Sequence, residues 1–467
     1  MHPIDIAVFA IYMIIVLAIG FYYYKKNKSA KDYYVGGNSM KSWHIGLSVV
    51  ATDVGGGFSI GLGGLGFVMG LSGSWMLLTG LIGAWLSAVL LIPKVINEGH
   101  KFNLLTFPEL LKRNYGKKVA LVAGIISFIG YLGFTSSQLL AGAKLAVGTF
   151  PELSLTNALI IMGTVAMLYT VFGGIKAVIY TDTFQWIILM SGLIFIGIPV
   201  SFYALGGLDG ILKVLPNEFF RLDNITWIQM LNWAITIIPI WFVGMTLYQR
   251  IYACKDEKTA KKAWYIAGIF EYPIMAFMGV ALGLLSRVAV EQGMFATDGF
   301  LTAASLDPEI GLPLLLKNIL PVGLMGLMMS AYFSAIMSTA DSCLLAASGN
   351  FTTDILGLND KNPKTIKISQ VVTFIVGFVA ILIATAMTSV LDLMLLSYSF
   401  MVSGLLVPVL GMLYSKNKKP LAALLAMLFG GFSTLIITFL EVQIPYEFDP
   451  ILIGISISLV TYLIVKK

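Results

Sequence analysis

Two adjacent hydroxyl side chains, those of Ser338 and Thr339, lie in a long apolar stretch where they could bind a cation. A helix through this stretch would place small and hydroxyl residues on one face, because they recur at the spacing i, i+3, i+4 and i+7. They are Ala335, Ser338, Thr339 and Ser342. Hydroxyl oxygens carry little charge, so they suit a weakly held monovalent cation better than Ca²⁺, which favours several carboxylates. The alternative is structural, since hydroxyls in membrane helices often donate to the carbonyl four residues earlier.

A second apolar stretch carries a carboxylate, Asp53, and three consecutive glycines at 55–57 near its middle. Each glycine inside a helix costs about 1 kcal/mol relative to alanine, and an ionisable group at the bilayer centre costs about 2.5–3.5 kcal/mol. We therefore expect the helix to be unwound here, with carbonyls such as those of Ala51 and Val54 turned toward an ion, protein or water. Alternatively, Asp53 caps the second half of the helix.

Further carboxylates inside apolar stretches also need partners. Asp341 lies beside the hydroxyl face, Asp182 lies near the start of another stretch, and Glu271 lies in a third. Acids within a membrane typically mark ion or substrate pathways. The candidates for a second ion site or for coupling are Asp53, Asp182, Asp341 and Ser342. Asp182 could instead have a structural role, paired with Lys176 or with a backbone donor near the inner surface.

The composition predicts that these residues lie in a polytopic, all-α membrane protein. Of the 467 residues, 58% are hydrophobic and 12% are charged, whereas a soluble domain is about 25% charged. A bilayer core needs roughly 20 apolar residues per helix. Thirteen stretches meet this need, at about 4–24, 44–70, 74–96, 119–149, 153–172, 177–204, 227–249, 263–290, 318–345, 368–388, 392–414, 421–441 and 449–465.

Most of the 30 lysines and arginines fall in alternate loops between these stretches. Because basic residues collect on the cytoplasmic side of a membrane, this pattern predicts a cell-membrane protein with its N-terminus outside and its C-terminus in the cytoplasm. The first stretch lacks the basic start and the cleavage site of a signal peptide, so we expect it to be retained.

The stretch at 227–249 also predicts an interrupted helix, because it contains Pro239 and Gly244 near its middle. Two interrupted spans, five spans apart, indicate a transporter built from inverted repeats, with its site where the broken helices meet. Ordinary glycine packing with one tolerated proline is the alternative. The predicted division is an extra helix and cytoplasmic loop at 1–43, repeats at 44–204 and 226–414, an extracellular loop at 205–225, and two further helices at 415–467.

Other classes of function are disfavoured. The 3 histidines are scattered and the 2 cysteines are too few for a disulfide framework or a cysteine-rich metal site. The segment Gly61–Gly66 fits G-x-G-x-x-G, but it lies in an apolar span with no strand before it, which disfavours dinucleotide binding. The net charge of +6 comes from separate loops, so nucleic acid is not an expected partner. We expect neither an enzyme nor a required protein partner.

From about residue 32 to 408 the chain resembles the sodium:solute symporter family. The segments that carry the resemblance are Gly173–Val178 with Thr181, Asp182 and Gln185, Ser334–Ser342, and Tyr248–Arg250. The resemblance implies a LeuT-type core of two inverted five-helix repeats, with one helix before it and two after it, and solute uptake coupled to Na⁺. It also implies a principal sodium site made by the carbonyls of Ala51, Val54 and Ala335 and the hydroxyls of Ser338 and Thr339.

Departures from the family pattern concern the second ion and the solute. Members with two sodium ions carry serine where this chain has Asp341, and sugar-transporting members carry polar groups where this chain has 237–241. We therefore expect an amino acid or small organic acid rather than a sugar. The solute-binding candidates are Phe134, Gln138, Trp241 and Ser397. The alternatives are a proton-coupled carrier on the same fold, in which Asp53 or Asp182 titrates, and a channel or solute sensor.

Overall fold

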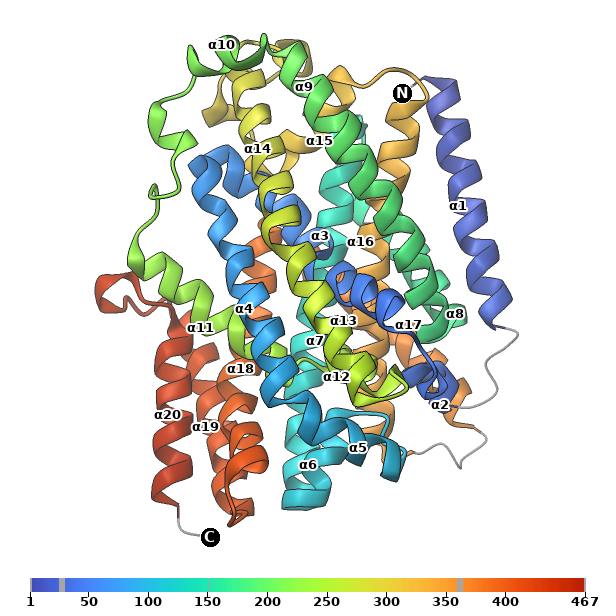
Figure 1. Ribbon diagram of the computed structural model, residues 1–467, viewed down its shortest axis with the longest axis vertical. Coiled ribbons are helices and arrows are strands. Elements are labelled where there is room, and N and C mark those ends of the chain that lie inside the picture. The colour runs from blue at the N-terminus through green and yellow to red at the C-terminus, as the bar shows by residue number, and fades with distance from the viewer. Residues whose placement is uncertain (1, 25–29, 151, 359–363, 466–467) are drawn as a thin grey trace.

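The computed structural model describes residues 2–24, 30–150, 152–358 and 364–465, which form helices and connecting segments and no β-sheet. The first helix, α1 (Pro3–Tyr24), begins at the upper end of the molecule as drawn in Figure 1, and the last, α20 (Pro450–Ile464), ends at the lower end. The long helices run broadly along the long axis between these ends. This arrangement agrees with the predicted all-α class.

The helices between these two have the following bounds. In the first half of the chain they are α2 (Ala30–Val35), α3 (Ser42–Met69), α4 (Trp75–Leu90), α5 (Ile92–Phe102), α6 (Phe107–Tyr115), α7 (Lys117–Thr149), α8 (Leu155–Gly192), α9 (Ile198–Ala204) and α10 (Gly207–Leu212). In the second half they are α11 (Trp227–Val243), α12 (Met245–Ala253), α13 (Glu257–Ile269), α14 (Ala276–Glu291), α15 (Pro308–Ile319), α16 (Leu324–Gly349), α17 (Thr365–Thr385), α18 (Val390–Tyr414) and α19 (Pro420–Phe439). Short helical turns of 3₁₀ or π geometry adjoin them at η1 (Gly36–Asn38), η2 (Gly70–Ser74), η3 (Leu193–Gly197), η4 (Asn217–Phe220), η5 (Phe270–Met275), η6 (Ala296–Asp298), η7 (Ala303–Ser305), η8 (Asn350–Ile355) and η9 (Pro445–Glu447).

Many of these helices are suited to a membrane. Among the described residues, 7 helical stretches are long and apolar enough to cross a bilayer, or 8 if α11 and α12 form one bent span. Shorter apolar helices occur at Pro3–Ile19, Leu155–Leu168 and Pro450–Ile464. The predicted count of thirteen spans stays a prediction. One predicted boundary differs, because the span placed at 318–345 corresponds to α16, which starts at Leu324 and is preceded by the separate helix α15.

Three interruptions mark the interior of the bundle. Gly55 leaves helical geometry within α3, with φ 34° and ψ −157°, and α11 meets α12 at Gly244 with a bend of 44°. Sequence composition predicts both. The third interruption is not predicted: Tyr272 in η5 has φ −135° and ψ 124°, directly before Pro273. Proline has no N–H to donate and clashes with the preceding turn, which explains the break at this position.

The helix α8 folds back on itself between two apolar parts, Leu155–Leu168 and Ile175–Ala204. Thr170 bonds to Asp341 on α16 and Asp182 bonds to Ser338 on the same helix. Twelve residues of straight helix would separate Thr170 from Asp182 by about 18 Å, whereas their partners lie less than one turn apart. The two arms of α8, with η3 and α9, therefore correspond to the stretches predicted at 153–172 and 177–204.

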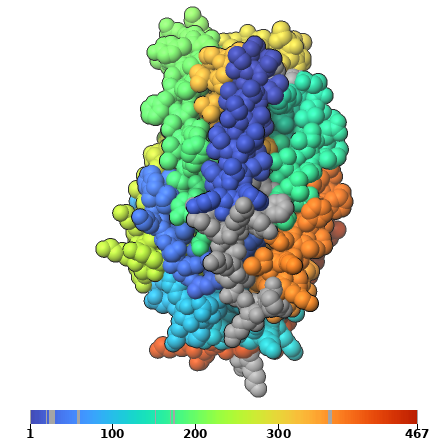
Figure 2. Space-filling model, turned by 90° about the vertical axis from the view of Figure 1, so that its right-hand side faces the viewer, coloured from blue at the N-terminus to red at the C-terminus, as the bar shows by residue number. Residues whose placement is uncertain are grey.

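The helix α1 packs on the outside of the bundle against α8 and α16, and Figure 2 shows it as a rod along that face. Its buried residue Asp5 accepts hydrogen bonds from the backbone N–H groups of Gly323, at 2.7 Å, and Gly326, at 2.8 Å. These N–H groups lie at the start of α16, where a helix has no internal acceptors for them. Asp5 thus caps α16 from a different helix.

Candidate ion site

The interruption of α3 brings its backbone close to α16. A methyl group added at Gly55 would lie 2.8 Å from Thr339 Cβ and nearer still to the Thr339 hydroxyl. Glycine tolerates the positive φ and has no Cβ to fill this space. The approach of α3 to α16 therefore depends on the absence of a side chain at position 55.

Thr339 joins backbone oxygens of both helices. Its hydroxyl Oγ1 donates to the carbonyl oxygen of Ala51 at 2.9 Å and lies 3.4 Å from the carbonyl oxygen of Ala335. Val54 is buried one residue before the interruption. Three of the five predicted sodium ligands thus meet around one hydroxyl. Carbonyl and hydroxyl oxygens of this kind can replace the hydration shell of a monovalent ion.

Ser338 faces a different partner in this conformation. Its hydroxyl donates to Asp182, whose other carboxylate oxygen accepts from the Ser48 hydroxyl. Asp182 is buried, at 1% exposure. Asp182 does not pair with Lys176, because Lys176 Nζ instead pairs with Asp32 at 2.9 Å.

A buried guanidinium group organises the space beside Asp182. Arg250 at the end of α12 donates through Nε to Ser48 Oγ at 3.0 Å and through Nη2 to Ser342 Oγ at 2.9 Å and to Thr52 Oγ1. Nη2 also lies 3.5 Å from Asp182 Oδ2, and both side chains of this ion pair are fully buried. We call Ser48, Thr52, Asp182, Arg250 and Ser342 the arginine cluster. Its oxygens belong to α3, α8 and α16.

Asp341 is buried near this cluster but bonds elsewhere. The Thr170 hydroxyl on α8 donates to Asp341 Oδ1, while Asp341 Oδ2 has no hydrogen-bond partner among the described residues. The structure therefore separates two residues that the sequence grouped together: Ser342 bonds to Arg250, and Asp341 bonds to α8.

Two of the solute-binding candidates, Gln138 and Ser397, bond to backbone. Gln138 Oε1 accepts from the N–H of Gly56 at 2.8 Å, which places the amide directly at the interruption of α3. Ser397 donates to the carbonyl of Leu393, in its own helix, at 2.8 Å and packs against Gly133 of α7. The position of Gln138 suits a solute site, whereas Ser397 has the bonding typical of packing.

The two aromatic candidates are both buried. Phe134 packs edge-on against Tyr398, with ring centroids 5.0 Å apart, and Trp241 does the same against Trp264 at 6.3 Å. The Trp241 ring lies over Gly83 of α4, and its Nε1 has no hydrogen-bond partner among the described residues. Trp241 thus keeps a free donor in the interior.

A second charged group closes the upper end of the bundle. Glu309, at the start of α15, accepts from the N–H groups of Val390 and Leu391 at the start of α18, with distances of 3.1–3.2 Å, and from Lys144 of α7. Its Cγ would contact a methyl group added at Gly64 of α3 at 3.3 Å. We call Lys144, Glu309 and the two N–H groups the latch. It holds α3, α7, α15 and α18 together.

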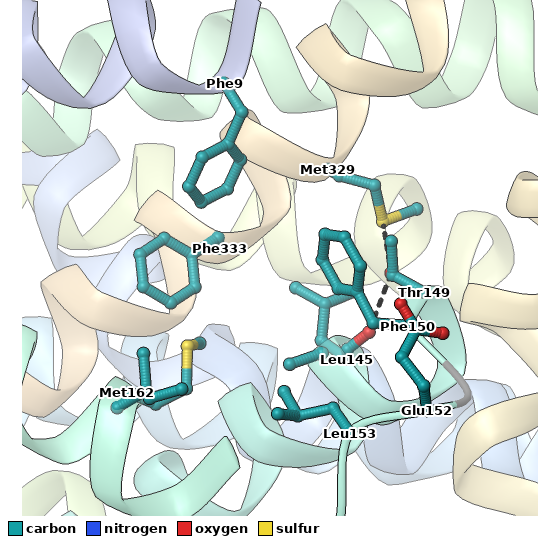
Figure 3. A pocket seen from close by; sticks show the side chains of 11 residues that line it. Phe9, Leu145, Thr149, Phe150, Glu152, Leu153, Met162, Met329 and Phe333 are labelled. Atoms are coloured by element: carbon teal, nitrogen blue, oxygen red, sulfur yellow. Dashed lines mark hydrogen bonds between the residues drawn. The ribbon is translucent and has the colours of Figure 1, made fainter. Parts of the chain in front are cut away.

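An apolar pocket of about 330 Å³ lies between α1, α7, α8 and α16 (Figure 3). In Figure 3, Phe9, Met162 and Phe333 border one part of it and Leu145 and Met329 another. The side chains around it are mainly aromatic and aliphatic, with few oxygens to bind an ion. This pocket is therefore separate from the candidate ion site.

The sequence alone does not identify the residues that complete these clusters. Ser48, Thr52 and Thr170 are hydroxyls in apolar stretches, and such hydroxyls usually bond within their own helix. Arg250 stands out as a lone arginine at the end of an apolar stretch, and this is the one signal that could have marked it. Its pairing with Asp182 depends on how the helices pack.

A protein-family model described as the sodium:solute symporter family matches residues 33–430. The chain belongs to the sodium:solute symporter family. This match confirms the family indicated by the segments Ser334–Ser342 and Tyr248–Arg250. The family and the similar proteins described below are transporters rather than enzymes, which agrees with the predicted class.

Mammalian members of the sodium:solute symporter family are among the similar proteins. The sodium/myo-inositol cotransporter 2 of Mus musculus is 31% identical over 389 residues, covering 76% of this chain and 57% of the mouse protein. The sodium/glucose cotransporter 1 of Sus scrofa is 27% identical over 394 residues, covering 75% of this chain and 58% of the pig protein. The match thus spans less than two thirds of the length of these relatives.

Solved structures share the fold. A Na⁺-coupled sialic acid symporter in a substrate-bound outward-open state has a TM-score of 0.79, with 21% identity and coverage of 99% of this chain and 97% of that chain. A nucleobase-cation-symport-1 family transporter in a closed conformation has a TM-score of 0.59, with 14% identity and coverage of 92% of both chains. This chain therefore has the same helical fold as these two structures.

Proposed function

We propose that this protein couples the inward movement of Na⁺ to the uptake of a small organic solute by alternating access. The observation that carries the proposal is the meeting of the Thr339 hydroxyl with the carbonyl oxygens of Ala51 and Ala335, at the interruption of α3. Membership of the sodium:solute symporter family supports Na⁺ as the ion.

Sodium would bind to Ala51, Val54, Ala335, Ser338 and Thr339, which requires the Ser338 hydroxyl to turn from Asp182 toward the ion. Because these ligands belong to α3 and α16, the ion would favour conformations in which the two helices stay in contact. One charge that crosses 100 mV yields about 2.3 kcal/mol. That energy supports roughly fortyfold accumulation of a neutral solute.

We further propose thirteen spans in a LeuT-type arrangement, divided as the sequence predicts. The interruptions of α3 and of α11–α12 fall in the two predicted repeats, 44–204 and 226–414. The start of α1 and the end of α20 lie at opposite ends of the molecule, as an odd number of spans requires (Figure 1). The basic helices α5 and α6 lie at the end where α20 finishes, which supports a cytoplasmic C-terminus and an external N-terminus in the cell membrane.

For the solute, we propose an amino acid. Asp53 and Glu271 are both buried beside the α3 interruption, and their like charges disfavour an anionic solute in a low-dielectric site. This argues against a simple organic acid. The relatives named for myo-inositol and glucose favour a polyol or sugar as the second candidate.

Uptake by purified protein in liposomes tests the proposal. The panel contains amino acids, organic acids, hexoses and myo-inositol, and each is measured with an inward Na⁺ gradient and with K⁺ in its place. We expect accumulation of an amino acid only with Na⁺. Uptake that requires an acidic exterior but no Na⁺ would identify a proton-coupled carrier instead, and rapid flux without accumulation would identify a channel.

The Thr339 hydroxyl provides a direct test of the sodium site. We expect Thr339→Val, which removes the hydroxyl and nearly preserves the shape, to raise the Na⁺ concentration for half-maximal uptake about tenfold, or roughly 1.4 kcal/mol. Thr434→Val is the matched control, because the buried Thr434 hydroxyl donates within its own helix α19, to the carbonyl oxygen of Gly430 at 3.2 Å. Equal Na⁺ dependence of both variants would contradict the site assignment.

The latch predicts that loss of the Glu309 charge makes the interior more accessible to reagents from the upper, external end of the bundle. Glu309→Gln removes the charge that binds Lys144 and weakens the bonds to α18, a loss of about 1.5–3 kcal/mol. We expect a roughly tenfold or larger increase in the labelling rate of a cysteine placed at Leu312, which is buried against Gly63 of α3, in a variant without Cys254 and Cys343.

Asp307→Asn serves as the control for the latch. Asp307 also pairs with Lys144, at 2.7 Å, but its side chain is 41% exposed, so its removal should change labelling little. If Glu309→Gln labels no faster than the control, the latch does not hold the external end closed.

A further inference from the structure

Two buried carboxyl groups, those of Asp53 and Glu271, lie beside Gly80 of α4, and neither takes part in the contacts described for the sodium site or the arginine cluster. Asp53 lies on α3, two residues before the interruption at Gly55, and Glu271 lies in η5, directly before the interruption at Tyr272. Their exposures are 5% and 0%. A methyl group added at Gly80 of α4 would lie close to carboxyl oxygens of both residues. Two breaks in different helices thus bring two acids to one place.

Gly80 of α4 provides the space that these groups occupy. A methyl group added at Gly80 would lie 3.9 Å from Asp53 Oδ2 and would overlap Glu271 Oε2. Oxygens of both residues therefore border the same small volume against the backbone of α4. Any other residue at position 80 would push the Glu271 carboxyl group away.

These oxygens have no donor from the protein. Asp53 Oδ2, Glu271 Oε1 and Glu271 Oε2 are all without a hydrogen-bond partner among the described residues. Asp182 differs in this respect, since it receives bonds from Ser48, Ser338 and Arg250. Burial of an unpaired carboxylate is costly, so such groups normally have a positive partner.

The pair also borders the region of the solute candidates. Gly80 lies one turn of α4 before Gly83, against which Trp241 packs, and Asp53 lies three residues before Gly56, whose N–H donates to Gln138. The region therefore offers two carboxyl groups with neutral polar groups nearby. This combination suits a ligand with one positive charge rather than two.

We propose that Asp53 and Glu271 bind a monovalent cation at a site separate from Thr339. The positive charge is either a second Na⁺ or the ammonium group of the transported solute. This inference rests on the proposed sodium-coupled uptake. It adds a second binding site for a positive charge in the interior of the protein. The test therefore distinguishes the two sources and also separates this site from the principal sodium site.

The first measurement is the amount of ²²Na⁺ bound at saturation per molecule of purified protein. If the pair binds sodium, the wild-type protein holds two ions, and Glu271→Gln and Thr339→Val each reduce the number to one. If Thr339→Val loses an ion and Glu271→Gln does not, the proposed function stands and the pair is not a sodium site. If the wild-type protein binds no sodium, the proposed function itself fails.

The second measurement tests the ammonium source. Methylammonium chloride is added at constant Na⁺ and constant ionic strength, and the thermal unfolding midpoint is followed. If the pair binds an ammonium group, the wild-type midpoint rises and saturates, and Glu271→Gln removes the rise. Glu441→Gln, a change at an exposed residue, keeps it.

Gly80→Ala provides a second variant in case Glu271→Gln does not fold. It keeps both carboxyl groups but displaces that of Glu271. It should therefore reduce the binding of Na⁺ or of methylammonium in the same way as Glu271→Gln. The proposal is overturned if the variants that fold bind as much Na⁺ as the wild-type protein and methylammonium has no saturable effect. In that case the two carboxyl groups share a proton and bind no cation.

Discussion

Gly55→Ala is expected to abolish sodium-dependent uptake while the protein still folds. Alanine at this position would hold a φ of 34°, which costs about 1–3 kcal/mol for a residue with a side chain. Its methyl group would also lie 2.8 Å from Thr339 Cβ, so α3 and α16 would have to separate. We expect no saturable ²²Na⁺ binding at the Thr339 site and at least a hundredfold loss of uptake.

Gly61→Ala is the control for this variant. It changes a glycine of the same helix whose added methyl group would meet the flexible side chain of Leu391 at 3.3 Å, so we expect nearly normal uptake. If Gly55→Ala binds Na⁺ with wild-type affinity, the interruption of α3 is not part of the ion site.

The second large effect is expected for Arg250→Gln. Arg250 and Asp182 form an ion pair with no exposure, and removal of one partner from a buried pair costs about 3–5 kcal/mol because the other charge stays uncompensated. The guanidinium group also donates to Ser48 and Ser342. We expect a strongly lowered thermal unfolding midpoint and loss of uptake in the purified variant.

A double variant separates the effect of charge from the effect of packing. In Arg250→Gln/Asp182→Asn no unpaired charge is left, so the midpoint should recover by a large part of the loss seen in Arg250→Gln. If the double variant is less stable than Arg250→Gln by the full cost of Asp182→Asn alone, the two residues act independently and the ion pair does not matter for stability.

The sequence predicts the membrane fold and two of the three interruptions because these depend on local composition. Three glycines with Asp53, and Pro239 with Gly244, each weaken a helix whatever surrounds it. Pro273 carries the same local signal, but within a long apolar stretch one proline is also compatible with a mild kink. The extent of that break depends on how η5 packs.

The candidate site is only partly predictable for the same reason. The shared helix face of Ala335, Ser338 and Thr339 follows from helical periodicity alone. The approach of Thr339 to Ala51, and of Arg250 to Asp182, joins residues far apart in the chain. A single sequence does not show which residues that are far apart in the chain lie close together in space. The family resemblance supplied the first of these two contacts, and the second required coordinates.

Because Asp5 caps α16, the peripheral helix α1 helps to hold α16 in place. The Asp5 carboxylate holds the N–H groups of Gly323 and Gly326, and a negative charge at that position also opposes the positive end of the helix dipole. The start of the hydroxyl-bearing helix is therefore anchored to the periphery of the protein. Removing the start of the chain, Asp5 included, should loosen the framework on which α3 packs, even though the deleted residues are remote from every ion ligand.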